Sequence, residues 1–249
     1  MTHVNEKTCN RALHLDCLSM TKLLSRQPRL DALRGAAMVW MTVYHGCFDL
    51  HQFHLLDANF YADPFWTLQR NCIVSLFLLC AGLAQGLGEP SWPRFWKRWG
   101  QIVACALLVT LGSLWMFPRS FISFGVLHGI AVMLLLLRLL KPAPRVCLLL
   151  GAAALLAPQF LQHSFFDSRW TDWVGLVTHK PPTEDYVPLL PWFGVMLWGY
   201  GLARWKPTLL AGELPRVFAP LAFMGRWSLS YYILHQPVMI GLLTLTMRG

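Results

Sequence analysis

The residues of this sequence that could do chemistry lie along one predicted helix, over residues 30–53. Asp31, Arg34, His45 and Asp49 follow one another at intervals of three, eleven and four residues. An α-helix turns about 100° and rises about 1.5 Å per residue, so all four share one face, and Arg34 lies roughly 16 Å from His45 along the axis. A guanidinium binds phosphate, and an imidazole accepts a proton. The spacing predicts His45 as a general base whose ring Asp49 orients.

A second interpretation of this stripe is structural. Arg34 would then extend to the membrane surface, and His45 with Asp49 would lock neighbouring helices together. Two more histidines, His128 and His235, fall inside apolar runs. Three histidines can bind a metal, but the sequence has no H-x-x-x-H spacing, so no metal site is predicted. The seven cysteines are interpreted as small buried hydrophobes.

The helix that carries this stripe belongs to a strongly apolar chain. Of 249 residues, 55% are hydrophobic and 13% are charged, against about 25% charged in ordinary globular domains. A soluble fold of this size could not bury so much apolar surface. The sequence therefore predicts an all-α, polytopic integral membrane helical bundle. Its seven transmembrane helices are predicted over residues 30–53, 71–87, 99–117, 121–140, 146–161, 188–205 and 227–247.

The distribution of charge predicts the orientation of these helices. With the N-terminus in the cytoplasm, most of the 21 Lys and Arg residues fall on the cytoplasmic side. They are Lys7, Arg11, Lys22, Arg26, Arg29, Arg34, Arg94, Lys97, Arg98, Arg138, Lys141, Arg145, Arg204, Lys206, Arg216 and Arg226. The excess of basic residues is thus explained by the orientation of the chain in the membrane, and no nucleic-acid partner is predicted. Residues 1–28 are predicted to be a polar cytoplasmic tail, and residues 29–249 a transmembrane domain.

Two long segments are predicted on the opposite side of the membrane. Residues 50–70 contain His54, and residues 162–187 contain Asp185 and Tyr186, with Trp192 shortly after them. Aromatic rings beside carboxylates suit sugar binding, by stacking and by hydrogen bonds to hydroxyls. An interfacial belt of aromatic residues with solvated charges explains the same composition. The sequence favours neither interpretation.

Several motifs together resemble a known family. The blocks RLDALRG, VYHGCFDL, LFLLCAG, FGVLHGIA, DYVPLLPWFGV and GRWSLSYYILHQPV follow one another from Arg29 to near the C-terminus. In this order they resemble small bacterial members of the heparan-alpha-glucosaminide N-acetyltransferase catalytic family. The resemblance implies transfer of an acetyl group from cytoplasmic acetyl-CoA to a sugar amino group across the bacterial inner membrane.

The resemblance also bears on the site. The spacing from Arg34 to His45 is similar to the arginine–histidine signature of membrane acyltransferases that O-acetylate polysaccharides, which implies an essential His45. The mammalian lysosomal member differs, with asparagine at the position matching His45 and a histidine further along. The nearest equivalents here are His51 and His54, so His54 is a second candidate base.

Together with the resemblance, these observations predict an enzyme, with residues 29–249 as a transmembrane acyltransferase domain. Asp31, Arg34, Arg98, His128 and His235 are expected to bind acetyl-CoA. Asp185, Tyr186 and Trp192 are expected to bind a sugar or glycan that accepts acetyl on an amino or hydroxyl group. A proton-coupled transporter of small molecules or lipid carriers is the alternative, since intramembrane His and Asp also relay protons. A third possible function is that of a purely structural membrane subunit. A homodimer stays open.

Overall fold

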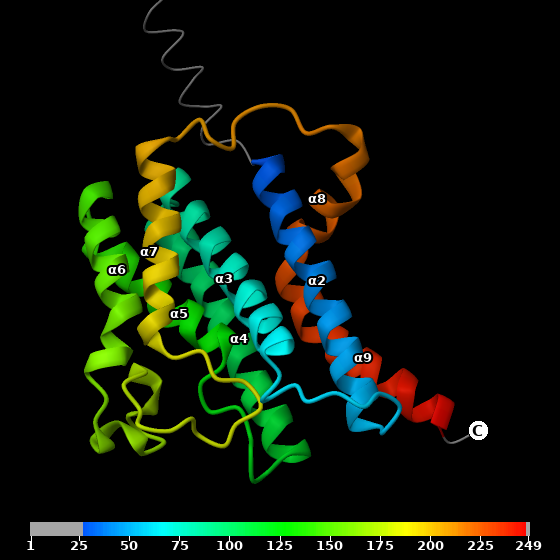
Figure 1. Cartoon of the computed structure of the whole chain (residues 1–249). Helices are drawn as coiled ribbons and strands as arrows, with labels where there is room; N and C mark the ends of the chain where they lie inside the picture. The colour runs from blue at the N-terminus through cyan, green and yellow to red at the C-terminus, as the bar shows by residue number, and fades with distance from the viewer. Residues whose placement is uncertain (1–26, 248–249) are drawn as a thin grey trace, which may run out of the picture.

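The computed structural model describes residues 27–247, and these residues form helices without any strand (Figure 1). The α-helices are α2 (Pro28–Gln52), α3 (Pro64–Leu87), α4 (Trp92–Met116), α5 (Val126–Leu140), α6 (Pro144–Phe160), α7 (Leu189–Trp205), α8 (Ala219–Arg226) and α9 (Ser228–Met247). Three short 3₁₀ helices are η1 (Ser164–Asp167), η2 (Asp172–Val174) and η3 (Arg216–Phe218). The all-helical prediction is confirmed for this part of the chain.

Local sequence signals set where the helices begin. α2, α3 and α6 each start at a proline, Pro28, Pro64 and Pro144. Proline suits the first turn, where its fixed φ fits the helix and its missing N–H is not needed. At α3 the side chain of Asp63 also accepts a hydrogen bond from the backbone N–H of Phe65, at 2.8 Å. Such N-caps satisfy one of the unpaired donors at a helix start.

Successive long helices run in alternate directions, so the bundle has two distinct ends (Figure 1). The α8 end carries the starts of α2, α4 and α6 together with α8 (top of Figure 1). The loop end carries the segments 53–63, 117–125 and 161–188 (bottom of Figure 1). Cations gather at the α8 end and most carboxylates at the loop end, which is the charge asymmetry that the sequence predicts.

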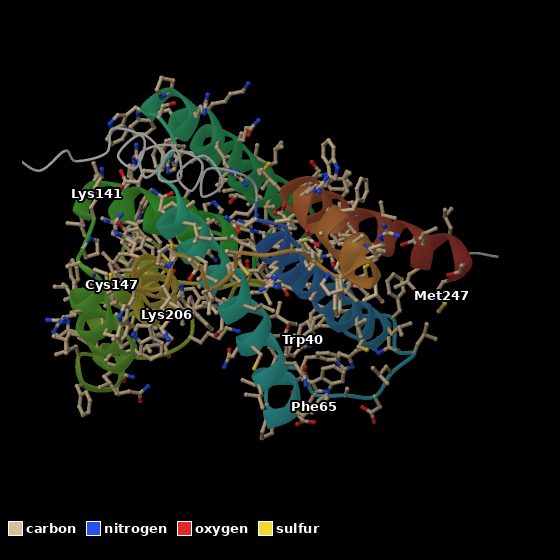
Figure 2. The ribbon with its side chains drawn as sticks, turned by 90° about the horizontal axis from the view of Figure 1, so that it is seen from above. Trp40, Phe65, Lys141, Cys147, Lys206 and Met247 are labelled. Atoms are coloured by element: carbon tan, nitrogen blue, oxygen red, sulfur yellow. The ribbon has the colours of Figure 1, made fainter. Side chains whose placement is uncertain are left out.

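The helices form two packing units. In the α7 unit, α3 and α6 pack on opposite sides of α7, and α5 contacts α3 and α7. In the α2 unit, α8 and α9 pack along α2. Figure 2, seen from the α8 end, shows Cys147 and Lys206 of the α7 unit on one side and Met247 of α9 on the other.

Apolar cores hold each unit together and join them. The core of the α7 unit centres on Leu78, Met133 and Met196, none of which is exposed. Tyr44 and Ile73 belong to a second cluster between α2 and α3. Tyr232 of α9 packs against both clusters and therefore lies at the junction of the two units.

The predicted spans correspond to helices, with three corrections. α3 and α4 begin seven residues earlier than predicted. α5 begins only at Val126, because residues 121–125 form an irregular segment before it. α8 was not predicted. The predicted tail, residues 1–28, falls almost wholly outside the described residues, as do Cys9 and Cys17.

Two of the described helices are long and apolar enough to cross a membrane, α3 and α4. α5 and α6 are apolar but shorter, at 15 and 17 residues. α4 leaves Leu107, Leu108, Leu111 and Trp115 exposed along its length, as a lipid-facing helix would. The prediction of seven spans goes beyond these findings.

Candidate active site

Four polar side chains meet where α9 crosses α2, inside the bundle. The ring centroids of His45 on α2 and His235 on α9 lie 5.2 Å apart, at an interplanar angle of 62°. One turn further along α2, Asp49 Oδ1 accepts a hydrogen bond of 2.7 Å from Gln236 Nε2. We call these four residues the polar seam. It joins two helices that are almost 190 residues apart in the sequence.

Each member of the polar seam keeps one buried polar atom without a hydrogen-bond partner among the described residues. These atoms are His45 Nδ1, Asp49 Oδ2, His235 Nε2 and Gln236 Oε1. An unsatisfied buried polar group costs about 1–3 kcal/mol, and native structures contain few. Four of the seven such atoms within residues 27–247 belong to this one cluster, which makes the polar seam a candidate site.

The surrounding contacts determine the proton positions on His235. Its Nδ1 lies 2.7 Å from the backbone carbonyl of Tyr232. A carbonyl only accepts, so Nδ1 carries the proton, and in the neutral ring Nε2 holds the lone pair. Tyr231 stacks on the same ring at 6.0 Å, and its hydroxyl lies 2.7 Å from Thr42 Oγ1. His235 is therefore held with an acceptor atom inside the seam.

The structure brings Asp49 and His45 into one cluster without the hydrogen bond that the sequence suggested. Asp49 follows His45 by one helical turn, and its Oδ1 is bonded to Gln236. The ring that faces His45 belongs to His235, and the edge of Tyr44 contacts His45 at 5.7 Å. The predicted hydrogen bond from Asp49 to the His45 ring is therefore not found among the described residues. Residues of α9 contact both side chains instead.

At the α8 end, Asp31 and Arg34 lie on the same face of α2, as their spacing predicts, and they form an ion pair. Arg34 Nη1 lies 3.1 Å from Asp31 Oδ1, and the Arg34 side chain is only 16% exposed. The backbones of α2 and α8 touch beside this pair, where a Cβ on Gly35 would collide with the carbonyl of Leu221. The close approach fixes α8 against the first turns of α2.

A pocket of about 450 Å³ opens at this end of α2 and α8. Arg216 and Arg226 line it together with Pro28, Glu213, Leu214, Ala219 and Ala222. Arg29 donates two hydrogen bonds to the backbone carbonyl of Glu213, at 3.3 and 3.4 Å. The pocket therefore offers guanidinium groups that suit phosphate.

The other predicted donor-binding and catalytic residues lie elsewhere. Arg98 is exposed on α4. His128 sits at the start of α5, where its Nδ1 accepts from the N–H of Gly125 at 3.3 Å and its Nε2 lies 3.2 Å from Thr110 Oγ1. His54 is exposed in the 53–63 segment, with a positive φ of 59°. None of the described contacts brings these three residues to His45.

At the loop end, the predicted sugar-binding residues make structural contacts. Asp185 Oδ2 accepts a 2.8 Å hydrogen bond from the N–H of Val126, which caps α5. Burial raises the pKa of Asp185, although this hydrogen bond opposes the rise. The Tyr186 hydroxyl donates to the carbonyl of Asp172 at 2.7 Å, and Trp192 packs against the core of the α7 unit. These contacts hold the 161–188 segment against the bundle.

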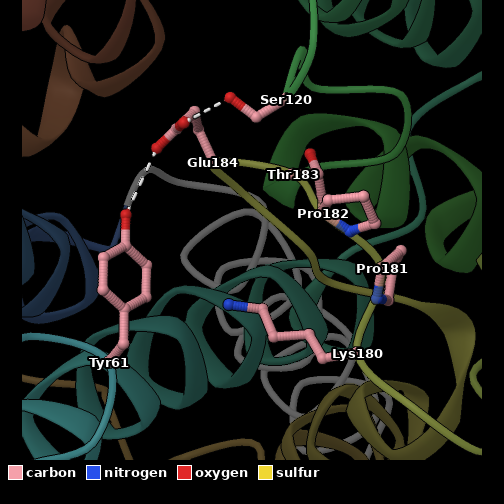
Figure 3. Close-up of a pocket in the computed structure, with 7 residues that line it drawn as sticks. All are labelled: Tyr61, Ser120, Lys180, Pro181, Pro182, Thr183 and Glu184. Carbon is pink, nitrogen blue, oxygen red and sulfur yellow. Dashed lines mark hydrogen bonds between the residues drawn. The ribbon is translucent and has the colours of Figure 1, made fainter.

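A second pocket, of about 250 Å³, lies beside these residues at the loop end (Figure 3). Glu184 spans it, with Oε1 accepting from Ser120 at 2.6 Å and Oε2 from Tyr61 at 3.5 Å. Lys180 lines the same pocket with Pro181, Pro182 and Thr183. Three separate loops thus meet around one polar opening.

Sequence reasoning missed Gln236 of the polar seam and the pocket residues Arg216, Arg226 and Lys180. Gln236 directly follows His235 in the motif YYILHQPV, so a search for polar neighbours of intramembrane histidines would have found it. Arg216 and Arg226 were assigned only to membrane orientation. Their place in a pocket depends on the fold of the segment between α7 and α9.

Comparison with known proteins gives one match. A family model described as heparan-alpha-glucosaminide N-acetyltransferase, catalytic, matches residues 26–237. The matched region contains both sides of the polar seam and both pockets. No curated protein matches the chain, and no solved structure matches it.

Proposed function

Because the chain belongs to the heparan-alpha-glucosaminide N-acetyltransferase catalytic family, we propose that it carries an acetyl group from cytoplasmic acetyl-CoA to a sugar or glycan on the other side of the membrane. The acceptor atom is an amino nitrogen or a hydroxyl oxygen. The observation that carries the proposal is the polar seam. Two imidazoles face each other inside the bundle, and each keeps a buried ring nitrogen without a partner among the described residues.

The proposed topology places the α8 end in the cytoplasm and the loop end in the periplasm of a bacterial inner membrane. Cations gather at the α8 end, in agreement with the positive-inside rule. The alternating helix directions fit seven crossings, with α8 and α9 forming the last (Figure 1). In this arrangement each substrate reaches the polar seam from its own compartment.

The α8-end pocket is the proposed entry for the donor. Arg216 and Arg226 would meet the phosphates of acetyl-CoA there, and Arg34 lies further along α2. The axial distance from Arg34 to His45 is about 16 Å at 1.5 Å per residue, which an extended pantetheine arm can span. The thioester would then reach His45 while the nucleotide stays at the membrane surface.

The proposed chemistry is direct transfer. The acceptor nitrogen or oxygen attacks the thioester carbonyl, and the imidazole of His45 takes the proton that the acceptor loses. The carbon–sulfur bond breaks, and the thiolate of coenzyme A then takes that proton. While His45 is protonated, Nε2 of His235 can accept a hydrogen bond from it. This contact stabilises the charge that develops on His45 in a water-poor site.

Transfer by the purified protein in nanodiscs tests this proposal. Isotope-labelled acetyl-CoA is supplied with an amino sugar, and the label is followed into acetylated product. The His45→Ala variant is expected to lose about 10²–10⁴-fold in rate, the usual contribution of a general base. The His179→Ala variant, which removes an imidazole that is 69% exposed at the loop end, should transfer normally. Normal transfer by the His45→Ala protein would move the base elsewhere.

The same preparation separates an enzyme from a transporter. A transporter with intramembrane histidines would move its substrate without consuming acetyl-CoA. Calorimetric titration of the wild-type protein with acetyl-CoA should show binding before any acceptor is added. Absence of binding, together with absence of labelled product, would end the enzymatic proposal.

A further inference from the structure

The contact between Asp49 on α2 and Gln236 on α9 has no role in the transfer step described above. Asp49 Oδ1 accepts a hydrogen bond of 2.7 Å from Gln236 Nε2. Since a carboxylate oxygen only accepts, the atom of Gln236 that faces it is the amide nitrogen. The amide oxygen of Gln236 is therefore left for another partner.

The two remaining oxygens of this contact are buried and of one chemical kind. Asp49 Oδ2 and Gln236 Oε1 have no hydrogen-bond partner among residues 27–247, and Asp49 is only 3% exposed. A carboxylate oxygen and an amide oxygen both accept hydrogen bonds. Asp49 also forms no ion pair in this part of the chain. Because a buried carboxylate is costly unless it is paired, the two oxygens suit a group that brings several hydrogen-bond donors.

The position of the Asp49–Gln236 pair along α2 indicates which substrate brings these donors. Asp49 lies four residues beyond His45, which is about 6 Å along the helix axis toward the loop end. Arg34 and the α8-end pocket lie on the other side of His45. Acetyl-CoA would therefore approach His45 from one side, and the pair borders the side from which the acceptor would come.

Hydrogen-bond chemistry leads to the same assignment. The oxygen and sulfur of a thioester carry no hydrogen, so neither can satisfy Asp49 or Gln236. The attacking group of the acceptor does carry hydrogens. An amino group has two or three of them and can satisfy both oxygens at once, whereas a hydroxyl has one and leaves an oxygen buried and unpaired, which is costly.

We propose that Asp49 and Gln236 together hold the attacking group of the acceptor, and that the second acceptor oxygen, supplied by Gln236, makes the site choose an amine over a hydroxyl. The inference rests on the proposed function for the reaction, and on the contacts between α2 and α9 for the site. Asp49 Oδ2 and Gln236 Oε1 each accept one N–H. The pair thus positions the amine beside His45 and takes no part in breaking the carbon–sulfur bond.

Binding measured without acetyl-CoA tests the pair independently of transfer. The full-length protein in nanodiscs is titrated by calorimetry with glucosamine and with glucose, which has a hydroxyl in place of the amino group. Wild type should bind glucosamine more tightly. Gln236→Leu and Asp49→Asn should each bind glucosamine about tenfold less tightly, as expected for loss of a hydrogen bond to a charged group, and should bind glucose as wild type does. Equal binding of the two sugars by wild type would overturn the proposal.

Exchange of the two side-chain groups provides a rescue. Gln236→Glu alone sets two carboxylates against each other and should weaken the binding of glucosamine. Combined with Asp49→Asn, it places the amide on α2 and the carboxylate on α9, with both side chains unchanged in length. The hydrogen bond can then form in the opposite sense, and two acceptor oxygens again remain. The double variant should recover most of the affinity that each single variant loses. Absence of any recovery would show that the two residues do not act as a pair.

Gln69 on α3 provides the matched control, since it also joins α2 to another helix. Its Oε1 accepts a hydrogen bond of 2.7 Å from Trp40 Nε1, outside the polar seam. Gln69→Leu should leave the binding of both sugars unchanged. If Gln236→Leu lowers thermal stability as Gln69→Leu does, and likewise leaves the binding of glucosamine unchanged, Gln236 only links two helices and the proposal fails.

Transfer rates separate this inference from the proposed function. Gln236→Leu should raise the KM for glucosamine about tenfold, leave the KM for acetyl-CoA unchanged and reduce the preference for glucosamine over glucose. An unchanged preference would reject the role of the pair while leaving the acetyltransferase intact. Glucosamine binding that depends on both Asp49 and Gln236, without any acetyl transfer by wild type, would support the pair and count against the proposed function.

Discussion

The contact between α3 and α7 and the contact between α2 and α9 are built in opposite ways. α3 and α7 meet backbone to backbone, because Gly82 lies against the carbonyl of Met196 and Gly199 against that of Leu79. Apolar side chains fill the rest of that interface. α2 and α9 meet through His45, Asp49, His235 and Gln236, with four buried atoms left without partners among the described residues.

This difference separates stability from chemistry within one bundle. Close helix packing through small residues is a common way to hold transmembrane helices together. The α7 unit can therefore serve as a rigid support that needs no ligand. The α2 unit carries polar groups that lower its stability, which is typical of functional sites. Substitutions in the two interfaces should therefore affect different properties.

The largest effect that sharpens this contrast is expected at His235. The His235→Phe variant keeps a ring of similar size but loses the acceptor that faces His45. We expect kcat to fall about 10–100-fold, the value of one hydrogen bond to a charged group, with little change in thermal unfolding. Steady-state kinetics with varied acetyl-CoA concentration would measure kcat for the variant and for wild type.

Two observations would distinguish the roles open to His235. His235→Gln, which can still accept a hydrogen bond, should recover part of kcat. A higher KM for acetyl-CoA with kcat unchanged would instead assign His235 to the donor site, as the sequence suggested.

A smaller effect, on stability alone, is expected at Gly82. In the Gly82→Ala variant the new Cβ would collide with the Met196 carbonyl and approach Tyr200 N at 2.9 Å, so α3 and α7 must move apart. Overpacking of this kind costs about 1–3 kcal/mol. Thermal unfolding in detergent should occur at lower temperature, while the rate per folded molecule stays near wild type.

Gly112 on α4 is the matched control for this change, because nothing lies within 4 Å of a Cβ placed there. Gly112→Ala should leave stability unchanged or raise it slightly, since alanine favours helix more than glycine does. If both variants unfold alike, close packing is not what holds α3 to α7.

The smallest effect is expected in the ion pairs that tie the α7 unit together at the α8 end. Glu89 lies 2.6 Å from Lys141, 3.3 Å from Arg138 and 3.7 Å from Arg204. The hydrogen bond from Lys141 is the main cause of the lowered pKa of Glu89. Because the folded pKa is lowered, the stabilisation is present above the unfolded pKa of about 4.3 and is lost as the pH falls through the folded value.

Glu89→Gln should therefore reduce stability at pH 7 by up to about 1 kcal/mol, because the carboxylate is partly exposed and solvent screens its pairs. At a pH below the folded pKa of Glu89, the difference from wild type should disappear. Unfolding followed at several pH values would test this. A constant difference across that range would show that packing, and not charge, causes the loss.

Several features of the fold were predictable from residues close together in the sequence. The i,i+3 spacing of Asp31 and Arg34 predicted that the two side chains share a helix face, because a helix fixes the distance between such neighbours, and the structure adds their ion pair. The apolar runs predicted helices at all seven places. The predicted start of α5, at residue 121, was wrong. Asp185, some 60 residues later in the sequence, supplies the cap that begins the helix at Val126. α8 was missed, because its eight residues are too few for a clear apolar period.

The sequence alone determined an all-helical, apolar chain, the position of His45 on its first long helix and the family to which it belongs. These follow from composition, helical period and local motifs, which depend only on residues close together in the chain. The tertiary structure decided that His45 faces His235 rather than bonding Asp49, and that Gln236 takes the Asp49 carboxylate. It also decided that Tyr61, Ser120 and Glu184, from three separate loops, meet around one pocket. Contacts between distant segments depend on how helices cross, and no local spacing encodes that.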